Sequence, residues 1–253
     1  MSIPFSTLQL GQIVAIGNKI GGEEGIRRLL ADELMVVERA PKLSPNATAN
    51  GGITYASSLN AAAFLSDWAE FYKIYYGREI DLSTVPLPPI TVGFGWGVVV
   101  LPGLTPQLVF EKSRELFSCW KYDERSLDEV IDLAKEQRAT VTDPYVVWCR
   151  DRIEADEELK NTSAHQVKER GITTMTLSER ELLEQWYFWK SCGDHLDKQN
   201  VTLCAGSRRV GGYVPGADWD DGQGFCVGWY DVSNSGDHIR ARQVVSLPAT
   251  PAA

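Results

Sequence analysis

The chain lacks an excess of positive charge. Its 253 residues include 25 Lys and Arg against 34 Asp and Glu, which gives a formal net charge of −9. Proteins that coat duplex nucleic acid bind through clustered lysines and arginines, so this balance argues against that class. The hydrophobic fraction of 43% and the charged fraction of 23% are ordinary for a soluble globular protein, and they exclude wholesale disorder and a fibrous repeat.

A long uninterrupted apolar run is also absent. The longest apolar stretch, residues 90–104, is broken by repeated glycines and a proline, so it is too short to span a membrane as a helix. The first residues carry no basic side chain ahead of the apolar positions, a pattern unlike a secretory signal peptide. We therefore predict a cytoplasmic protein with no membrane partner.

Paired cysteines and nucleotide-binding glycines are missing too. The five cysteines are widely spaced and contain no CxxC pair, which favours reduced thiols over a disulfide framework. The alternating glycines at 93–97 do not form a GxGxxG motif, and no helix is expected to open directly after them. We predict no cofactor.

The patterns that are present predict an α+β protein in three parts. Residues 1–40 read as a helical hairpin, which favours a lid or a dimer contact over a DNA-reading motif. Residues 41–118 read as a linker, an aromatic helix over 59–76 and a glycine-rich strand. Residues 119–253 read as an α+β domain that ends in an antiparallel meander of three or four strands, packed on helices.

Capping signals place several helices in this scheme. Thr105 followed by Pro106 predicts a helix that runs to about residue 117. Ser126 with a glutamate three residues later, and Thr176 with Glu179, each fit a capping box. The second of these boxes predicts a helix that continues to about residue 190.

Several long segments resemble an uncharacterised family of bacterial hypothetical proteins. They are DPYVVWCRDRIEADEELKN, HLDKQNVTLCAGSR and RARQVVS, together with IGGEEGIRRLLADEL near the start. The resemblance implies no activity, cofactor or catalytic residue. The pattern of this family usually has Asn where this chain has His165 and Ser where it has Ala205, which argues against a catalytic role at either position.

The most acidic run of the chain is a candidate cation site. On a helix, Asp151, Glu154 and Glu158 would share one face and could offer oxygen ligands to a hard cation. The run has no EF-hand spacing, and Arg150 and Arg152 lie beside it. Structural ion pairing is therefore favoured over metal binding.

A second cluster could support nucleophilic catalysis. His195 precedes Cys204 and Ser207, and a thiol or hydroxyl needs a histidine within hydrogen-bond reach to become a nucleophile. No GxSxG or papain-like string accompanies them, and Cys204 sits in an apolar strand. A structural role is favoured for all three.

The third candidate is the face of the final sheet. Arg240 and Arg242 alternate in HIRARQ and would project from one side of a strand, where Trp229 and Arg208 could join them. Such a face would suit a protein partner or a small anionic or aromatic ligand. The sequence favours the other interpretation, in which the tryptophans are core and these arginines pair with nearby aspartates, namely Asp218, Asp220, Asp231 or Asp237.

These patterns favour a non-catalytic cytoplasmic binding or interaction protein that uses the C-terminal sheet. The alternative is a small hydrolase, such as a nuclease, that uses His195 with Cys204 or Ser207, or a cation held by carboxylates. The final 53 residues hold four arginines and five acidic residues, so this region is nearly neutral. An anionic or aromatic ligand in this region is therefore compatible with the negative net charge of the whole chain.

Overall fold

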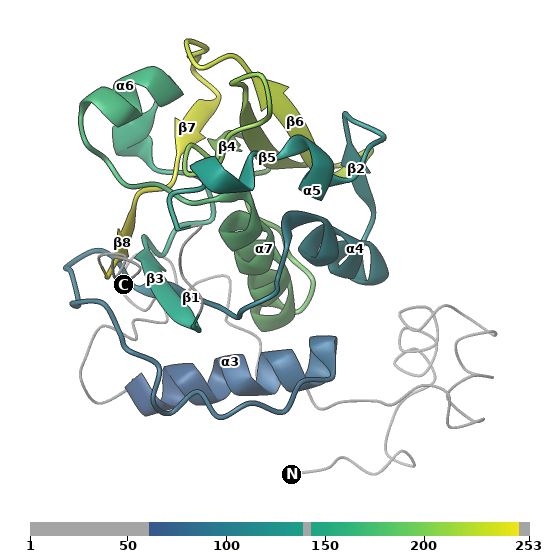
Figure 1. The fold of residues 1–253 in the computed structure, drawn as a ribbon, viewed down its shortest axis with the longest axis vertical. Coiled ribbons are helices and arrows are strands. Elements are labelled where there is room, and N and C mark those ends of the chain that lie inside the picture. Colours follow the sequence, from purple (N-terminus) through teal and green to yellow (C-terminus); the bar gives the residue numbers. More distant parts are fainter. Residues whose placement is uncertain (1–60, 139–142, 248–253) are drawn as a thin grey trace, which may run out of the picture. The chain divides into compact units, whose positions relative to one another are not determined.

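The structure is a computed structural model, and it describes residues 61–138 and 143–247 (Figure 1). The chain divides into two units, residues 1–41 and 42–253, and every described residue belongs to the second unit. The predicted helical hairpin over 1–40 and the predicted linker over 41–58 lie outside the described residues.

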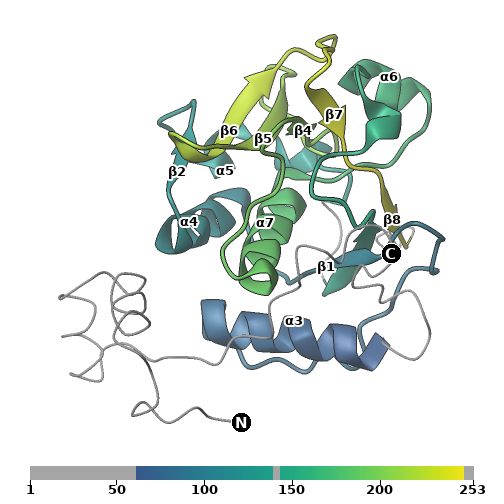
Figure 2. The ribbon, with the colours of Figure 1, turned by 180° about the vertical axis from the view of Figure 1, so that it is seen from behind.

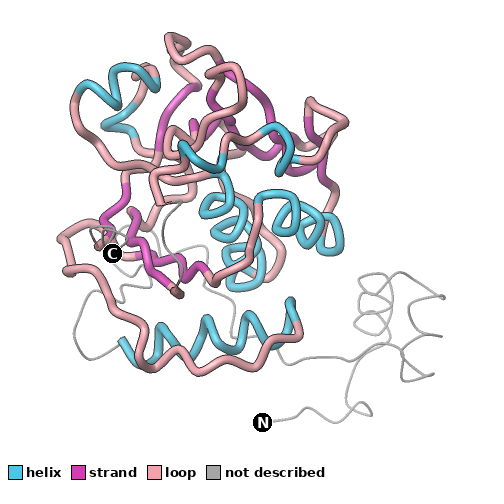
Figure 3. The backbone as a smooth tube through the Cα atoms, in the orientation of Figure 1, coloured by secondary structure: helices cyan, strands magenta, loops and turns pink. Residues whose placement is uncertain are grey.

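Helices and strands are interspersed along the described chain (Figure 3). The helices are α3 (Ala61–Tyr76), α4 (Pro106–Leu116), α5 (Leu127–Val130), α6 (Ala164–Glu169) and α7 (Leu177–Ser191), with 3-10 turns η2 (Leu133–Lys135) and η3 (Glu157–Leu159). The strands are β1 (Trp96–Val100), β2 (Cys119–Lys121), β3 (Tyr145–Cys149), β4 (Val201–Leu203), β5 (Val214–Asp220), β6 (Gly224–Tyr230), β7 (Ile239–Ala241) and β8 (Val244–Ser246). None of the helices in these ranges has the length and apolar character needed to cross a membrane.

Two sheets confirm the α+β class but correct the predicted meander. A three-stranded antiparallel sheet has the order β1-β3-β8, and a five-stranded sheet has the order β2-β6-β5-β4-β7. Strands β4, β5 and β6 are antiparallel, as predicted, whereas β7 runs parallel to β4 and β2 runs parallel to β6. The final sheet is therefore mixed. The reason is that β7 returns to the far edge beside β4, and β8 leaves to pair with β3.

The largest core lies between α3, the three-stranded sheet and α7. The predicted aromatic stripe of α3 is buried there, and Trp68 stacks on Trp186 of α7 with ring centroids 6.1 Å apart. The glycine-rich strand is explained by ring packing at Gly97. A Cβ on Gly97 would come within 2.4 Å of the Trp148 ring and 2.7 Å of the Phe64 ring, so neighbouring aromatic rings occupy that space. Strand β1 precedes residue 118 and β3 follows it, yet both contribute to this one core. The core therefore crosses the boundary predicted after residue 118.

Helix α7 is the central element of the described fold and packs against both sheets (Figures 1 and 2). The predicted capping box is present: the Thr176 hydroxyl accepts from the Glu179 backbone N–H, and the Glu179 carboxylate accepts from the Thr176 N–H. The helix continues to Ser191, and Cys192 follows in a left-handed conformation with φ 62°. Residues on every face of α7 are buried, charged ones included, so ion pairs must form inside the protein.

Helix α4 also begins as predicted. The Thr105 hydroxyl accepts from the Leu108 N–H at 3.3 Å, and Pro106 occupies the first helical turn. The helix predicted after Ser126 is much shorter than the capping pattern implied. It spans four residues, and the Ser126 hydroxyl accepts from the Asp128 N–H.

The five-stranded sheet is covered differently on its two faces. One face packs on a hydrophobic cluster with residues from α4, α5 and α7. On the other face, α6 and η3 cover the half formed by β4 and β7 through a third apolar cluster. The half of that face formed by β5, β6 and β2 is where an open pocket lies.

Candidate ligand-binding pocket on the five-stranded sheet

An open pocket of about 1050 Å³ lies over strands β2, β6 and β5 and the chain after β2. Aromatic and acidic side chains dominate its lining. The aromatic residues are Trp120, Tyr122, Tyr213, Trp229 and Tyr230, and the acidic residues are Asp123, Glu124, Asp218 and Asp220. Arg125, Arg209, Gln223, Cys226 and Gly228 complete the lining.

Strand register sets which side chains meet on the pocket floor. Asp218 of β5 pairs with Cys226 of β6, and Cys226 pairs with Trp120 of β2. Directly paired residues on neighbouring strands point to the same face of a sheet, so these three side chains form one row across the floor. The carboxylate and the indole therefore come from strands that lie far apart in the sequence.

The next row of the floor has no side chains. Gly216 pairs with Gly228 across β5 and β6. The Tyr230 ring occupies the space over Gly216, because a Cβ there would come within 2.4 Å of the Tyr230 Cε2 atom. A Cβ on Gly228 would meet the same Tyr230 atom only at 3.8 Å, an ordinary contact. The floor is therefore hollow at Gly228, which explains why a pocket forms there.

The pocket gathers all the exposed aromatic side chains of the described residues. Trp120 is 42% exposed, Tyr122 is 72% exposed and Tyr213 is 45% exposed, and all three line the pocket. Trp120 and Tyr122 form a T-shaped pair with ring centroids 5.8 Å apart. Large aromatic groups left in water at one place mark a surface suited to binding.

Two carboxylates on β5 face the pocket without a cation. Asp218 is half-buried, and its burial raises its pKa to about 6. Its side chain makes no hydrogen bond or ion pair with any described residue. Asp220 is exposed, and its Oδ1 atom accepts from the Gly222 and Gln223 N–H groups at 2.8 and 2.9 Å. Asp218 and Asp220 are two residues apart on β5, so both carboxylates lie on the face of the strand that forms the pocket floor.

Both arginines of the lining bind the same carboxylate. Arg125 and Arg209 each donate to Oδ2 of Asp123, at 2.7 and 2.8 Å, and these bonds hold the pKa of Asp123 well below its ordinary value. The Arg209 guanidinium also lies over the Trp229 ring, 5.3 Å from its centroid. The whole lining holds four carboxylates and two guanidinium groups, so its formal net charge is −2.

The structure places Arg240 and Arg242 in ion pairs away from this pocket. Arg242 is 1% exposed and donates to the Asp197 carboxylate at 2.7 Å and to the Thr202 hydroxyl at 3.2 Å. It also donates to two backbone carbonyls of the loop before η3. Arg240 pairs with Glu157 at 2.6 Å. The expected internal pairing of these arginines is present, but none of the four aspartates expected as partners takes part in it.

The other two residues predicted to contact a ligand line different hollows. Arg208 donates to the backbone carbonyls of Ala205 and Ser207 at 2.6 and 2.7 Å, and it lines a smaller hollow beside α6. Trp229 lies at the wall of the large pocket. Of the four predicted contacts, Trp229 alone lines that pocket.

The residues predicted for nucleophilic catalysis are not joined by hydrogen bonds. His195 Nδ1 lies 2.9 Å from Glu184 Oε1, and its ring stacks on Trp219 with centroids 3.2 Å apart. Cys204 and Ser207 have no exposed surface, and burial raises the pKa of the Cys204 thiol. The Ser207 hydroxyl accepts from a backbone N–H at the start of α7. Accordingly, the described residues show no contact between a nucleophile and His195.

The acidic run does not form the helix on which the cation hypothesis depended. Residues 150–156 are irregular, and the following turn η3 is a short 3-10 helix. Glu158 binds Arg152 at 2.6 Å, and Glu154 accepts from the Asn200 side chain at 2.7 Å. Without a helix, Asp151 shares no face with them, and the described residues contain no group of three ligating side chains arranged for a metal.

Reasoning from the sequence did not single out Trp120, Tyr122, Tyr213 or the β5 carboxylates as ligand contacts. Part of the signal was present, because alternation along residues 216–220 and 224–230 separates glycines and acidic groups from bulky apolar ones. The parallel pairing of β2 with β6 had no local signal. That pairing is what brings Trp120 and Tyr122 to the pocket.

Comparison of the chain with protein-family models, with curated proteins and with solved structures finds no match. Membership of the bacterial family named above stays a prediction. The geometry of the pocket is therefore the basis on which a function can be inferred.

Proposed function

We propose that this chain is a non-catalytic binding protein and that the pocket over β2, β6 and β5 is its ligand site. The observation that carries the proposal is the gathering of the exposed aromatic side chains of the described residues at one hollow. Leaving three large rings in water costs solvation free energy, and a ligand that covers them recovers it.

The neighbouring chemistry supports binding rather than catalysis. The buried thiol of Cys204 and the buried hydroxyl of Ser207 do not contact His195, which is held by Glu184. A catalytic nucleophile needs a base within hydrogen-bond reach and access to a substrate. The pocket offers aromatic faces, carboxylates and a hollow floor, which are features of recognition sites.

A titration followed by nuclear magnetic resonance tests the proposal. The probes are an arginine peptide (acetyl-Gly-Arg-Gly-amide), methyl β-glucoside and inorganic phosphate, and the readout is the indole N–H resonance of Trp120. We expect at least one probe to shift that resonance in a saturable way. The variant Gly228→Leu fills the hollow in the floor, where the nearest atom to a Cβ is 3.8 Å away, and should abolish the shift.

The matched control is Gly236→Leu. Gly236 lies in the loop between β6 and β7, outside the pocket, and a Cβ there meets its nearest atom at 3.5 Å. This variant should bind like the natural protein. The proposal fails if no probe shifts the Trp120 resonance, or if the shift survives in a folded Gly228→Leu protein.

A further inference from the structure

We infer that this pocket takes an arginine side chain presented by a partner protein, with the guanidinium at Asp218 and Asp220 and its flat face against the neighbouring aromatic rings. This inference rests on the proposed binding function and adds the chemical class of the occupant. It is carried by the charge, the shape and the aromatic composition of the lining.

The charge of the pocket lining favours a cationic ligand. Four carboxylates and two guanidinium groups line the pocket, and both guanidinium groups are bound to Asp123. Asp218 and Glu124 have no hydrogen-bond or ion-pair partner among the described side chains, and Asp220 bonds only to backbone N–H groups of its own turn. The lining as a whole has a formal net charge of −2, so it repels an anionic ligand and attracts a cation.

The arrangement of carboxylates and aromatic rings in the pocket favours a planar cation. Asp218 and Asp220 stand two residues apart on one face of β5, and Trp120 lies in the same row as Asp218, across Cys226. A guanidinium group offers several N–H donors in one plane and stacks on aromatic rings, so it can use both features at once. A lysine ammonium is a more strongly hydrated point charge and gains less from the rings.

The surroundings favour a side chain on a protein surface over a small free molecule. The pocket is open, and three partly exposed rings, Trp120, Tyr122 and Tyr213, line it. Tyrosine, tryptophan and arginine are the residues that most often dominate the binding energy of protein interfaces. An arginine anchored at the two carboxylates, with the partner surface covering the rings, fits this arrangement.

The ionisation of Asp218 adds a pH dependence to binding. Burial, together with the charges of Asp197 and Asp220, raises its pKa to about 6 against the opposing effect of Arg180 and His238. The carboxyl is therefore charged above about pH 6 and becomes neutral below it. Arginine binding should weaken as the pH falls from 7.5 to 5.

The test compares two peptides that differ only in charge. Acetyl-Gly-Arg-Gly-amide and its citrulline counterpart are titrated into the full chain, and the Trp120 indole resonance is followed. Citrulline keeps the shape of arginine but is neutral. We expect the arginine peptide to bind at least about tenfold more tightly, a difference of about 1.4 kcal/mol.

The double variant Asp218→Asn, Asp220→Asn should remove that preference. Both asparagines keep the size of the native side chains, and an amide oxygen at position 220 still accepts from the Gly222 and Gln223 N–H groups. The control is Asp237→Asn, an exposed aspartate outside the pocket, which should bind like the natural protein. Thermal unfolding shows that each variant is folded.

The outcomes separate this inference from the proposed function. Equal binding of the two peptides, or unchanged arginine binding in the double variant, overturns the cation inference and leaves the pocket as a ligand site. If neither peptide shifts the Trp120 resonance, the arginine inference is overturned, and the glucoside and phosphate titrations then decide the proposed function.

Discussion

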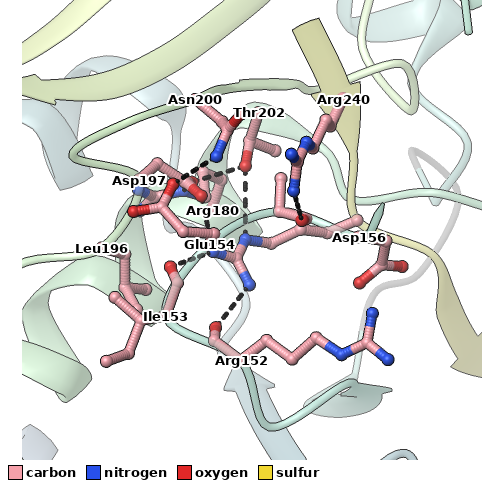
Figure 4. Close-up of polar contacts among 12 residues, drawn as sticks. Arg152, Ile153, Glu154, Asp156, Arg180, Leu196, Asp197, Asn200, Thr202 and Arg240 are labelled. Carbon is pink, nitrogen blue, oxygen red and sulfur yellow. Dashed lines mark hydrogen bonds and ion pairs between the residues drawn. The ribbon is translucent and has the colours of Figure 1, made fainter. Parts of the chain in front are cut away.

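Arg180 and Asp197 form an ion pair in which neither side chain has any exposed surface, with Nε and Oδ2 2.9 Å apart. Arg242 donates to the other oxygen of the same carboxylate at 2.7 Å. Thr202 donates to Oδ2 of Asp197 (Figure 4). Burial alone would raise the pKa of Asp197, but Arg242 and Arg180 hold it below its ordinary value. The Asp197 carboxylate therefore links Arg180 of α7 with Arg242, which lies directly after β7. This link ties the five-stranded sheet to the central helix.

Replacing Asp197 by Asn should therefore destabilise the fold strongly. The substitution leaves two buried guanidinium groups without their shared counter-charge, a change that typically costs about 3–5 kcal/mol. Urea unfolding followed by circular dichroism measures this loss. The control Glu111→Gln breaks an exposed pair with Arg114 and should cost less than about 1 kcal/mol. Equal effects of the two variants would show that the buried network is not stabilising.

Glu181 should make stability depend on pH. It is fully buried, neither of its oxygens has a hydrogen-bond partner among the described residues, and burial raises its pKa well above the ordinary value. The folded state therefore holds the proton more tightly than the unfolded chain, where Glu titrates at about 4.3. The stability linked to this group is full below that pH and is lost as the pH rises toward the folded pKa.

The variant Glu181→Gln removes this titration. At pH 8 the unfolded chain ionises Glu181, whereas the natural fold must keep it protonated or bury its charge, and this lowers the stability of the natural protein. The difference in Tm between Glu181→Gln and the natural protein should therefore be more positive at pH 8 than at pH 5. Thermal unfolding at the two pH values measures the difference. Glu70→Gln, at an exposed position on α3, serves as the control and should show no such change with pH. A gap for Glu181→Gln that is the same at both pH values would contradict the prediction.

Thr176 should contribute to stability through its hydroxyl. That hydroxyl accepts from the Glu179 N–H at 3.3 Å, and the Glu179 carboxylate accepts in return from the Thr176 N–H at 2.9 Å. Thr176→Ala should cost about 1 kcal/mol, as for other N-cap residues. Thr176→Ser keeps the hydroxyl and should retain most of the stability. Urea unfolding of the two variants decides the matter, and equal losses would assign the effect to packing instead.

Gly216 and Gly228 should respond differently to the same substitution. A Cβ at Gly216 would lie 2.4 Å from the Tyr230 ring and 2.9 Å from Val201, so Gly216→Ala should destabilise by about 1–3 kcal/mol. At Gly228 the nearest atom is 3.8 Å away, and Gly228→Ala should be neutral or slightly stabilising. Chemical denaturation compares the pair. A larger loss for the variant at 228 would refute the account of the pocket floor.

Predictions from local sequence succeeded where the interaction is local. The Thr176 cap and the Thr105–Pro106 start each involve groups within one helical turn, so the starts of α7 and α4 could be read directly. The strands of the C-terminal region were also found, and β4, β5 and β6 pair antiparallel as predicted, but the parallel pairings of β7 and β2 were not predicted. Strands of three residues carry too few side chains to specify a neighbour, and the parallel positions of β7 and β2 came from long-range packing.

The candidate site shows the same division. Alternation along β5 places Asp218 and Asp220 on one face, a property of the strand itself. Whether that face meets solvent, helix α6 or another strand depends on elements distant in sequence. Likewise, alternation predicted one shared side for Arg240 and Arg242 but could not show that Asp197 and Glu157 would take them as partners.

By itself, the sequence determined the α+β class, the starts of the capped helices and the acidic balance, because periodicity, capping and charge act through residues near one another in the chain. Only the tertiary structure decided that Trp120, Cys226 and Asp218 form one row beside the hollow at Gly228. It also decided that the Asp218 and Asp220 carboxylates have no ion-pair partner among the described residues. Those outcomes depend on strand order and register, which are fixed by the packing of the whole domain around α7.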